Sequence, residues 1–319
     1  MPITQLASES LAPNDGRAAL RWDGTRILVG IGYPPPTWKL SLSMYAWDGA
    51  AFSLVNTVDG GFELETAGTR IRLHAHTSRI LYDSPQGSTT ASGGGLGAWS
   101  FNGSVLAYDK TVYVYPGMIG MGPGEWRGKL YSYDRQGSFV FTCGRTFEVV
   151  SPPPPDFVLQ YVYLLDAIEY DGGVPTHRKT VTLPSSAAVG NVLCWSNYVF
   201  VCGSDLIRKY EFAGPPTYAL TLDSSYAVPP GVISDIGHFL AGSYIFGYDG
   251  SVVTAYDWVM NVVATIDTTR AITSINMSGD RLFVSQSGPF IQTYTFDGAA
   301  FTLEDEGAIA VSSSVVLDV

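Results

Sequence analysis

The chain has 319 residues, of which 46% are hydrophobic and only 15% are charged, and its formal net charge is −11. So low a charged fraction disfavours a disordered chain or a coiled coil, and the length suffices for one large domain or two ordinary ones. The acidic charge and the lack of a basic stripe disfavour nucleic acid and an anionic membrane surface as partners.

The N-terminal sequence MPITQLASES has neither a basic start nor an apolar run, so we expect no secretion signal. No stretch approaches the roughly 20 apolar residues of a membrane-spanning helix, and we expect no membrane insertion. We therefore expect a protein that is made in the cytoplasm. Glycine and proline, with 35 and 19 residues, separate short apolar runs along the chain, which is typical of many short strands joined by turns.

One pattern recurs along the chain: an aromatic residue, any residue, a second aromatic residue, Asp, Gly, and a Phe three residues after the Gly. It is clearest at 45–52 and 294–301. Aromatic residues two apart point to one face of a strand, and Asp-Gly supplies the positive φ angle of a tight two-residue turn. The pattern predicts a hairpin whose aromatic residues pack between neighbouring sheets. Counting weaker copies, the second aromatic position is occupied by Trp47, Phe101, Tyr133, Tyr170, Phe212, Tyr256 and Phe296.

The spacing of these copies indicates the fold class. A strand–turn–strand segment such as 192–201 precedes the signature, and two successive hairpins form a four-stranded antiparallel blade. Strand-rich repeats of about 40 residues are typical of a β-propeller. We therefore predict an all-β chain that forms a single β-propeller domain over 1–319, with about seven blades and eight as the alternative. The predicted blades are 17–60, 68–104, 105–145, 146–183, 190–224, 230–268 and 271–307, with 308–319 and 1–13 pairing to close the ring.

Three long loops, at 33–38, 83–96 and 115–127, fall on one rim of such a ring. The first and third are rich in aromatic residues and Met and include an Arg, the residue types enriched at the centres of protein interfaces. One hypothesis is that they form a contact surface for other protein subunits, and the alternative is that they fold back onto their own blades. The candidate contact residues are Tyr33, Trp38, Tyr115, Met118, Met121, Trp126 and Arg127.

Candidate metal ligands are few. His74 and His76 lie two apart on an expected inner strand and face the same way, and His238 could join them near the axis. Because no matched carboxylate accompanies them, we expect ordinary channel-lining side chains, no metal and no cofactor. An odd number of cysteines without metal-type spacing predicts free buried thiols at Cys143, Cys194 and Cys202.

The Asp residues of the signature could suggest calcium or acid–base chemistry. Their place at predicted hairpin turns explains them instead, since one Asp per blade lies too far from the next to share a cation. They are Asp48, Asp134, Asp171, Asp257 and Asp297.

Motifs of catalysis are absent from the sequence: there is no nucleophile elbow, no phosphate-binding loop and no zinc-protease helix. The segment 132–139 distantly resembles the Asp-box turn of sialidase-type propellers, which is a structural motif there. We therefore predict a protein that is not an enzyme.

The Tyr-x-aromatic-Asp-Gly-x-x-Phe repeat, as at 45–52 and 294–301, resembles repeats of structural propeller proteins of tailed-phage virions. The acidic, lysine-poor composition is similar to that of such proteins. The resemblance implies a non-enzymatic neck, tail or decoration component that docks on other protein subunits. A glycan-binding propeller lectin is one alternative, and a propeller hydrolase or lyase with an axial site is another.

Overall fold

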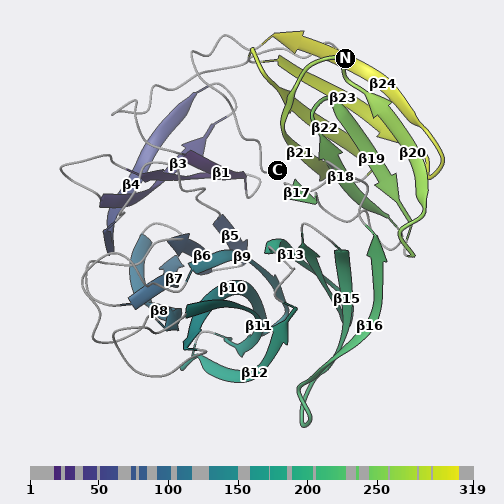
Figure 1. Ribbon diagram of the computed structural model, residues 1–319. Coiled ribbons are helices and arrows are strands. Elements are labelled where there is room, and N and C mark those ends of the chain that lie inside the picture. Colours follow the sequence, from purple (N-terminus) through teal and green to yellow (C-terminus); the bar gives the residue numbers. More distant parts are fainter. Residues whose placement is uncertain are drawn as a thin grey trace.

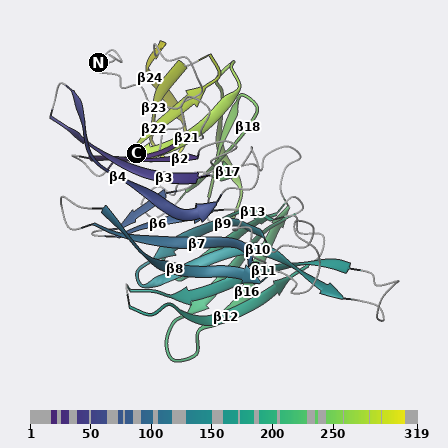
Figure 2. The same cartoon turned by 90° about the vertical axis from the view of Figure 1, so that its left-hand side faces the viewer.

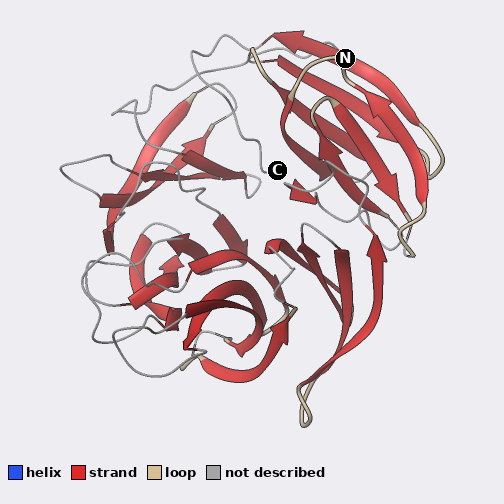
Figure 3. Cartoon of the chain, viewed as in Figure 1, coloured by secondary structure: helices blue, strands red, loops and turns tan. Residues whose placement is uncertain are grey.

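A computed structural model describes most of the chain between residues 18 and 308 (Figure 1). Within the described residues every regular element is a β-strand, as Figure 3 shows. The segments that are not described are 1–17, 23–25, 33–38, 49–50, 64–72, 77–78, 85–91, 102–105, 117–128, 150–158, 172, 185–188, 204–205, 228–234, 237–243, 258, 279, 289 and 309–319.

The described strands form six four-stranded sheets. The first three sheets contain β1 (Ala18–Trp22), β2 (Arg26–Gly32), β3 (Lys39–Trp47) and β4 (Phe52–Glu63); β5 (Leu73–His76), β6 (Arg79–Ser84), β7 (Ser92–Phe101) and β8 (Leu106–Pro116); and β9 (Lys129–Gln136), β10 (Phe139–Val149), β11 (Leu159–Glu169) and β12 (Thr176–Leu183). The other three contain β13 (Val189–Trp195), β14 (Tyr198–Gly203), β15 (Leu206–Ala213) and β16 (Ala219–Ala227); β17 (Asp235–Ile236), β18 (Ile245–Asp249), β19 (Val252–Tyr256) and β20 (Val262–Asp267); and β21 (Ile272–Ser278), β22 (Arg281–Gln286), β23 (Phe290–Phe296) and β24 (Phe301–Ala308).

In every sheet each strand pairs antiparallel with the next strand of the sequence. Figure 1 shows the six sheets arranged around a centre, with the first strand of each sheet toward the middle and the fourth toward the outside. Successive sheets touch through their inner strands, as β1 does with β5, β9 with β13, and β13 with β17. In the side view of Figure 2 the first three sheets lie above one another as layers. A ring of four-stranded antiparallel sheets is a β-propeller, and the predicted all-β fold class is confirmed.

The blade boundaries differ from the prediction in the first half of the chain. Where the sequence predicts three blades between 68 and 183, the structure has two sheets, so six blades lie in the described residues. Residues 106–116 form the fourth strand of the second sheet and not the start of a new blade. The signature copy with Tyr133 at its second aromatic position lies on β9, which is the first strand of its sheet. The turn at Gly137 (φ 57°) leads from β9 into β10, the second strand. The other predicted blades agree with the observed sheets to within a few residues.

A β-bulge interrupts the pairing of the third and fourth strands in all six sheets. In five sheets it falls next to the first aromatic position of the signature, which Ile168 occupies in the third sheet. In the fifth sheet it falls at Tyr256, which the sequence places at the second aromatic position. An extra residue in an edge strand twists the strand and hinders pairing with a foreign chain. The fold thereby protects the six outer edges that it exposes. The third-strand residues after the register shift are Tyr45, Trp99, Ile168, Tyr210, Tyr256 and Tyr294.

The second aromatic residue of the signature packs against the preceding blade, as predicted. Phe212 of β15 meets Phe141 of β10 edge to face, with 4.9 Å between ring centroids. Phe296 of β23 meets Phe246 of β18 in the same way at 5.2 Å. Such pairs contribute about 0.5–1.5 kcal/mol each beyond the burial of their area. The repeat therefore encodes contacts between blades.

A carboxylate also joins two blades at their inner strands. Asp134 of β9 accepts a hydrogen bond of 2.7 Å at Oδ2 from the backbone amide of Cys194 on β13. The expectation that Asp134 shapes a third-to-fourth-strand turn is therefore wrong, because the residue lies within the first strand of its sheet. Residues 1–13 and 309–319 of the predicted closure, and the proline run at 152–155, lie outside the described residues, whereas Ala308 ends β24.

Candidate functional site

The ring has two rims, which the strand directions define. Turns between first and second strands and between third and fourth strands lie on one rim, which we call the tip rim. Turns between second and third strands and the links between sheets lie on the other, which we call the link rim. Backbone hydrogen bonds join neighbouring segments of the link rim, from the Ile272 amide to the Gly250 carbonyl (2.7 Å) and from the Ser287 amide to the Ala271 carbonyl (2.8 Å).

Exposed apolar side chains gather on the tip rim. Of the nine large apolar side chains that are exposed among the described residues, seven lie in tip-rim turns or within the first four residues of a fourth strand. Val174, in the turn between β11 and β12, is 85% exposed. The seven are Leu54, Val55, Val174, Leu222, Val259, Val262 and Leu303, whereas Tyr161 and Val252 lie toward the link rim.

Four of these side chains occupy one equivalent position. Each is the fourth-strand partner of the aromatic residue at the bulge. The pairs are Leu54 with Tyr45, Leu222 with Tyr210, Val262 with Tyr256, and Leu303 with Tyr294. Single exposed apolar residues are ordinary on a protein surface, but their repetition at one position of one rim marks a candidate contact surface.

Asp residues shape the turns of the tip rim. The Asp297 carboxylate accepts hydrogen bonds of 2.8 Å from the amides of Ala299 and Ala300, and these bonds lower the pKa of Asp297. Gly298 follows with φ 93°. The turn has four residues between the strands, so the two-residue turn expected from Asp-Gly is wrong in length, although the positive φ of the glycine is confirmed.

The same chemistry recurs in the neighbouring turns. Asp257 accepts from the amides of Val259 (3.0 Å) and Asn261 (2.8 Å), and Asp171 accepts from the amide of Gly173 (2.9 Å). Burial opposes ionisation of Asp257, but the bonds from Asn261 and Val259 outweigh it and lower the pKa. Together with Asp48, which accepts from the Ala51 amide, these residues confirm the prediction that the signature Asp shapes a turn.

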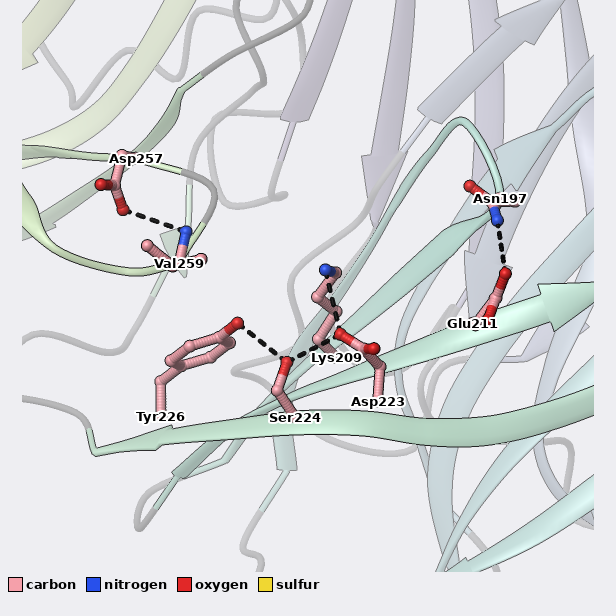
Figure 4. A network of polar contacts seen from close by, with 8 residues as sticks. All are labelled: Asn197, Lys209, Glu211, Asp223, Ser224, Tyr226, Asp257 and Val259. Atoms are coloured by element: carbon pink, nitrogen blue, oxygen red, sulfur yellow. Dashed lines mark hydrogen bonds and ion pairs between the residues drawn. The ribbon is translucent and has the colours of Figure 1, made fainter.

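A polar network fixes the outer edge of the fourth blade beside Leu222 (Figure 4). Asp223 is the extra residue of the bulge, and its Oδ2 lies 3.0 Å from Lys209 Nζ and accepts a hydrogen bond of 2.9 Å from the Ser224 hydroxyl. The bond from Lys209, followed by that from Ser224, lowers the pKa of Asp223. The Lys209 ammonium also lies over the Tyr198 ring, 4.0 Å from its centroid. These contacts hold the bulge in place, and the Lys209 ammonium and the Asp223 carboxylate offset each other's charge.

The third blade has His177 at the position that carries an exposed apolar residue in four other blades. His177 Nε2 lies 2.9 Å from Oδ1 of the buried Asp166 and 2.9 Å from the Thr180 hydroxyl, which also donates to Asp166. In a nucleophilic triad the two imidazole nitrogens divide these roles, one facing the acid and the other the hydroxyl. Here one nitrogen faces both, so the cluster ties β11 to β12 and does not have the geometry of a triad.

The sequence-predicted contact residues mostly lie outside the described residues. Of the seven, only Tyr115 falls in a described strand, near the end of β8, and its side chain is not described. The described strand ends that flank the segments 33–38, 85–91 and 117–128 lie on the link rim, opposite the exposed apolar side chains. The hypothesis that Tyr33, Trp38, Met118, Met121, Trp126 and Arg127 form a contact surface stays a prediction.

The structure does not describe the side chains of the three candidate metal-ligating histidines. His74 and His76 lie on β5, with their side chains outside the description, and His238 falls outside it altogether. Among the described residues no group of three or more His, Cys, Asp or Glu side chains has an arrangement that could hold a metal ion. In the same part of the chain no helix is long and apolar enough to cross a membrane.

The three cysteines are free thiols, as predicted. Cys143 and Cys202 are buried in the core. Burial, and then the nearby Asp134 carboxylate and Cys143 thiol, raise the pKa of Cys194 well above its ordinary value. A thiol with a raised pKa is a poor nucleophile, so Cys194 is suited to packing and not to catalysis.

No protein-family model and no curated protein matches the chain. Solved structures do match it. A putative 6-phosphogluconolactonase from Bacteroides uniformis is similar with a TM-score of 0.63 at 15% identity, over 95% of this chain and 88% of that chain. A periplasmic gluconolactonase from Pseudomonas aeruginosa gives 0.64 at 10% identity, over 93% and 86%.

A chain of a mitotic checkpoint complex is similar with a TM-score of 0.56 at 10% identity, over 99% of this chain and 90% of that chain. The structural similarity establishes a shared β-propeller fold. At identities this low it says nothing about activity.

The tip-rim surface was not predicted from the sequence, although a signal for it exists. Near the start of three outer strands, two large apolar residues lie two positions apart. The segments are Phe52-Ser-Leu54, Leu220-Thr-Leu222 and Phe301-Thr-Leu303. Because side chains alternate between the two faces of a strand, both residues of each pair lie on one face, and the pattern predicts that both are buried in the core. Only the structure shows that the second member is exposed.

Proposed function

We propose that this protein is a non-enzymatic β-propeller that docks on other protein subunits, and that its tip rim takes part in the contact. The observation that carries the proposal is the gathering of exposed apolar side chains on one rim, at equivalent positions of several blades. A contact made by equivalent positions of several blades lets a ring bind a broad surface without a deep pocket. Burial of these side chains supplies the favourable free energy of such a contact.

A particle of a tailed phage is the setting that we propose for this docking. The support is the resemblance of the 45–52 and 294–301 repeats to those of structural virion propellers, together with a net charge of −11 and only 18 Lys and Arg residues. This part of the proposal concerns where the protein docks, and the docking itself does not depend on it.

The proposal is tested by co-expression with the products of neighbouring genes, followed by size-exclusion chromatography and titration of the purified partner. We expect a stable complex whose affinity falls about tenfold or more in the triple variant Val259→Thr, Val262→Thr, Leu303→Gln, because apolar anchors dominate binding energy. The matched control is Val252→Thr, an exposed apolar position toward the link rim, which should bind normally. Loss of binding in Trp38→Ala, Trp126→Ala with an unaffected triple variant would move the contact to the link rim.

A sugar lactonase is the second candidate, because three of the similar solved structures carry that description. It predicts hydrolysis of gluconolactone or 6-phosphogluconolactone by the purified protein, measured by release of acid. Turnover above that of a heat-denatured sample, removed by single substitutions at the axis, would replace the docking proposal with an enzymatic one.

A further inference from the structure

The two rims differ in charge as well as in apolar exposure. Among the described turn residues of the tip rim five are Asp and none is Lys or Arg. The few described turn and link residues of the link rim include Arg270 and no acidic residue, although Asp249 and Asp267 end the adjoining strands β18 and β20. The tip-rim carboxylates belong to Asp48, Asp171, Asp257, Asp280 and Asp297. The apolar side chains of the tip rim are therefore interspersed with negative charge.

Three arginines close to the tip rim are engaged within the protein, whereas Lys179 of β12 is exposed to solvent. Arg281 Nε lies 3.2 Å from Glu304 Oε2, and Arg178 Nε donates to Glu169 Oε2 at 2.7 Å. Arg135 Nε donates to the Gly137 carbonyl at 2.8 Å. The guanidinium contacts lie with Glu304, Glu169 and a backbone carbonyl, and the hydrogen-bond donors of Asp257 and Asp297 are turn amides and the Asn261 side chain.

Asp257 and Asp297 remain charged at neutral pH, because hydrogen bonds lower the pKa values of both carboxyl groups. They are the two turn carboxylates nearest Val259, Val262 and Leu303 along the chain. A carboxylate has about four lone-pair sites, and the two turn amides at Asp297 occupy only one oxygen. Among the described residues no group donates to the second oxygen of Asp297, so that oxygen can accept a hydrogen bond from a partner.

The negative charge of the tip-rim turns limits which surfaces can bind to this rim. A second copy would bring the same carboxylates face to face, and like charges across an interface cost several kcal/mol. An anionic membrane or a nucleic acid is repelled for the same reason. A protein surface with Lys or Arg around an apolar centre complements both features at once.

We infer that the tip rim docks on a protein surface that is basic and apolar, with the apolar side chains of the fifth and sixth blades at the centre and the turn carboxylates around them. The inference rests on the proposed docking function and adds the chemistry of the partner. Its mechanism is displacement of water from Val259, Val262 and Leu303, with charge-assisted hydrogen bonds from the partner to Asp257 and Asp297.

The test uses the full chain and two synthetic amphipathic peptides, one of Leu and Lys and one of Leu and Glu, in fluorescence-anisotropy titrations. The charge variant Asp257→Asn, Asp297→Asn keeps an oxygen acceptor for each turn but removes both charges. Its matched control is Asp267→Asn, at the link-rim end of β20, where the carboxylate also caps a turn amide. Circular dichroism confirms that each variant is folded.

We expect the Leu/Lys peptide to bind the native protein and the Leu/Glu peptide not to bind. Affinity should fall about tenfold in the charge variant and also in the triple apolar variant, and stay unchanged in Asp267→Asn. Equal losses in Asp267→Asn and the charge variant would mean diffuse attraction and overturn the inference. Binding of the Leu/Glu peptide would overturn it too.

Two further outcomes separate this inference from the function on which it rests. If the purified partner depends on the triple apolar variant but not on the charge variant, docking stands and the basic chemistry fails. If analytical ultracentrifugation shows a native dimer that the triple variant disperses, a second copy covers the rim and the inference fails.

Discussion

The carboxylate of Asp134 and the backbone amide of Cys194 are 2.7 Å apart and join the innermost strands of two neighbouring blades. The bond crosses between sheets, where no backbone ladder operates. It acts at the same junction as the aromatic contact between Phe212 and Phe141, so polar and apolar contacts together fix how these blades sit against each other.

Replacing Asp134 by Ala should lower the free energy of unfolding by about 1–3 kcal/mol, because the Cys194 amide loses its partner in a partly buried place. Urea unfolding followed by circular dichroism measures the change. Asp171→Ala, which removes a bond to an exposed turn amide, is the matched control and should cost less. An equal cost in both variants would contradict the assignment of Asp134 as a link between blades.

Replacing Gly298 by Ala should also destabilise the fold, by about 1–3 kcal/mol. The glycine has φ 93°, and an added Cβ would lie 3.0 Å from the Tyr244 hydroxyl. Gly214 lies in the corresponding turn of the fourth blade with no atom within 4 Å of an added Cβ and no positive φ, so Gly214→Ala should have little effect. Thermal unfolding of the two variants makes the comparison, and equal midpoints would show that the turn tolerates a side chain.

Acid should weaken the protein through its turn carboxylates. Hydrogen bonds lower the folded-state pKa of Asp257 and Asp297 below the unfolded value. A lowered pKa contributes stability that is present above the unfolded pKa and is lost as the pH falls through the folded pKa. The urea midpoint should therefore fall between neutral pH and about pH 3. The fall should be smaller in Asp257→Asn, Asp297→Asn, and an unchanged fall would contradict the role of these two carboxylates.

The sequence carries much of the fold, because the repeated signature reports contacts that recur in more than one blade. Phe212 and Phe296 pack between blades as the pattern predicts. The copy at Tyr133 was assigned to the wrong strand of its blade. An aromatic pair followed by Asp occurs on an inner strand as well as on a third strand, and the local pattern does not distinguish the two. That one copy accounts for the additional blade expected between 68 and 183.

The candidate site was less accessible from sequence for a physical reason. Leu303 follows Phe301 by two residues, which places both on one face of β24, yet Phe301 is half-buried while Leu303 is 47% exposed. The difference depends on how far the neighbouring blade covers an outer strand, and this is a property of the assembled ring.

Amide hydrogen exchange of the protein, alone and in complex with its co-purified partner, tests the docking proposal most directly. We predict slower exchange in the tip-rim segments 257–262 and 297–303 on binding, with little change in the link-rim segments 33–38 and 117–128. Protection confined to 33–38 and 117–128, with the tip rim unaffected, would contradict the proposal and move the contact to the opposite rim.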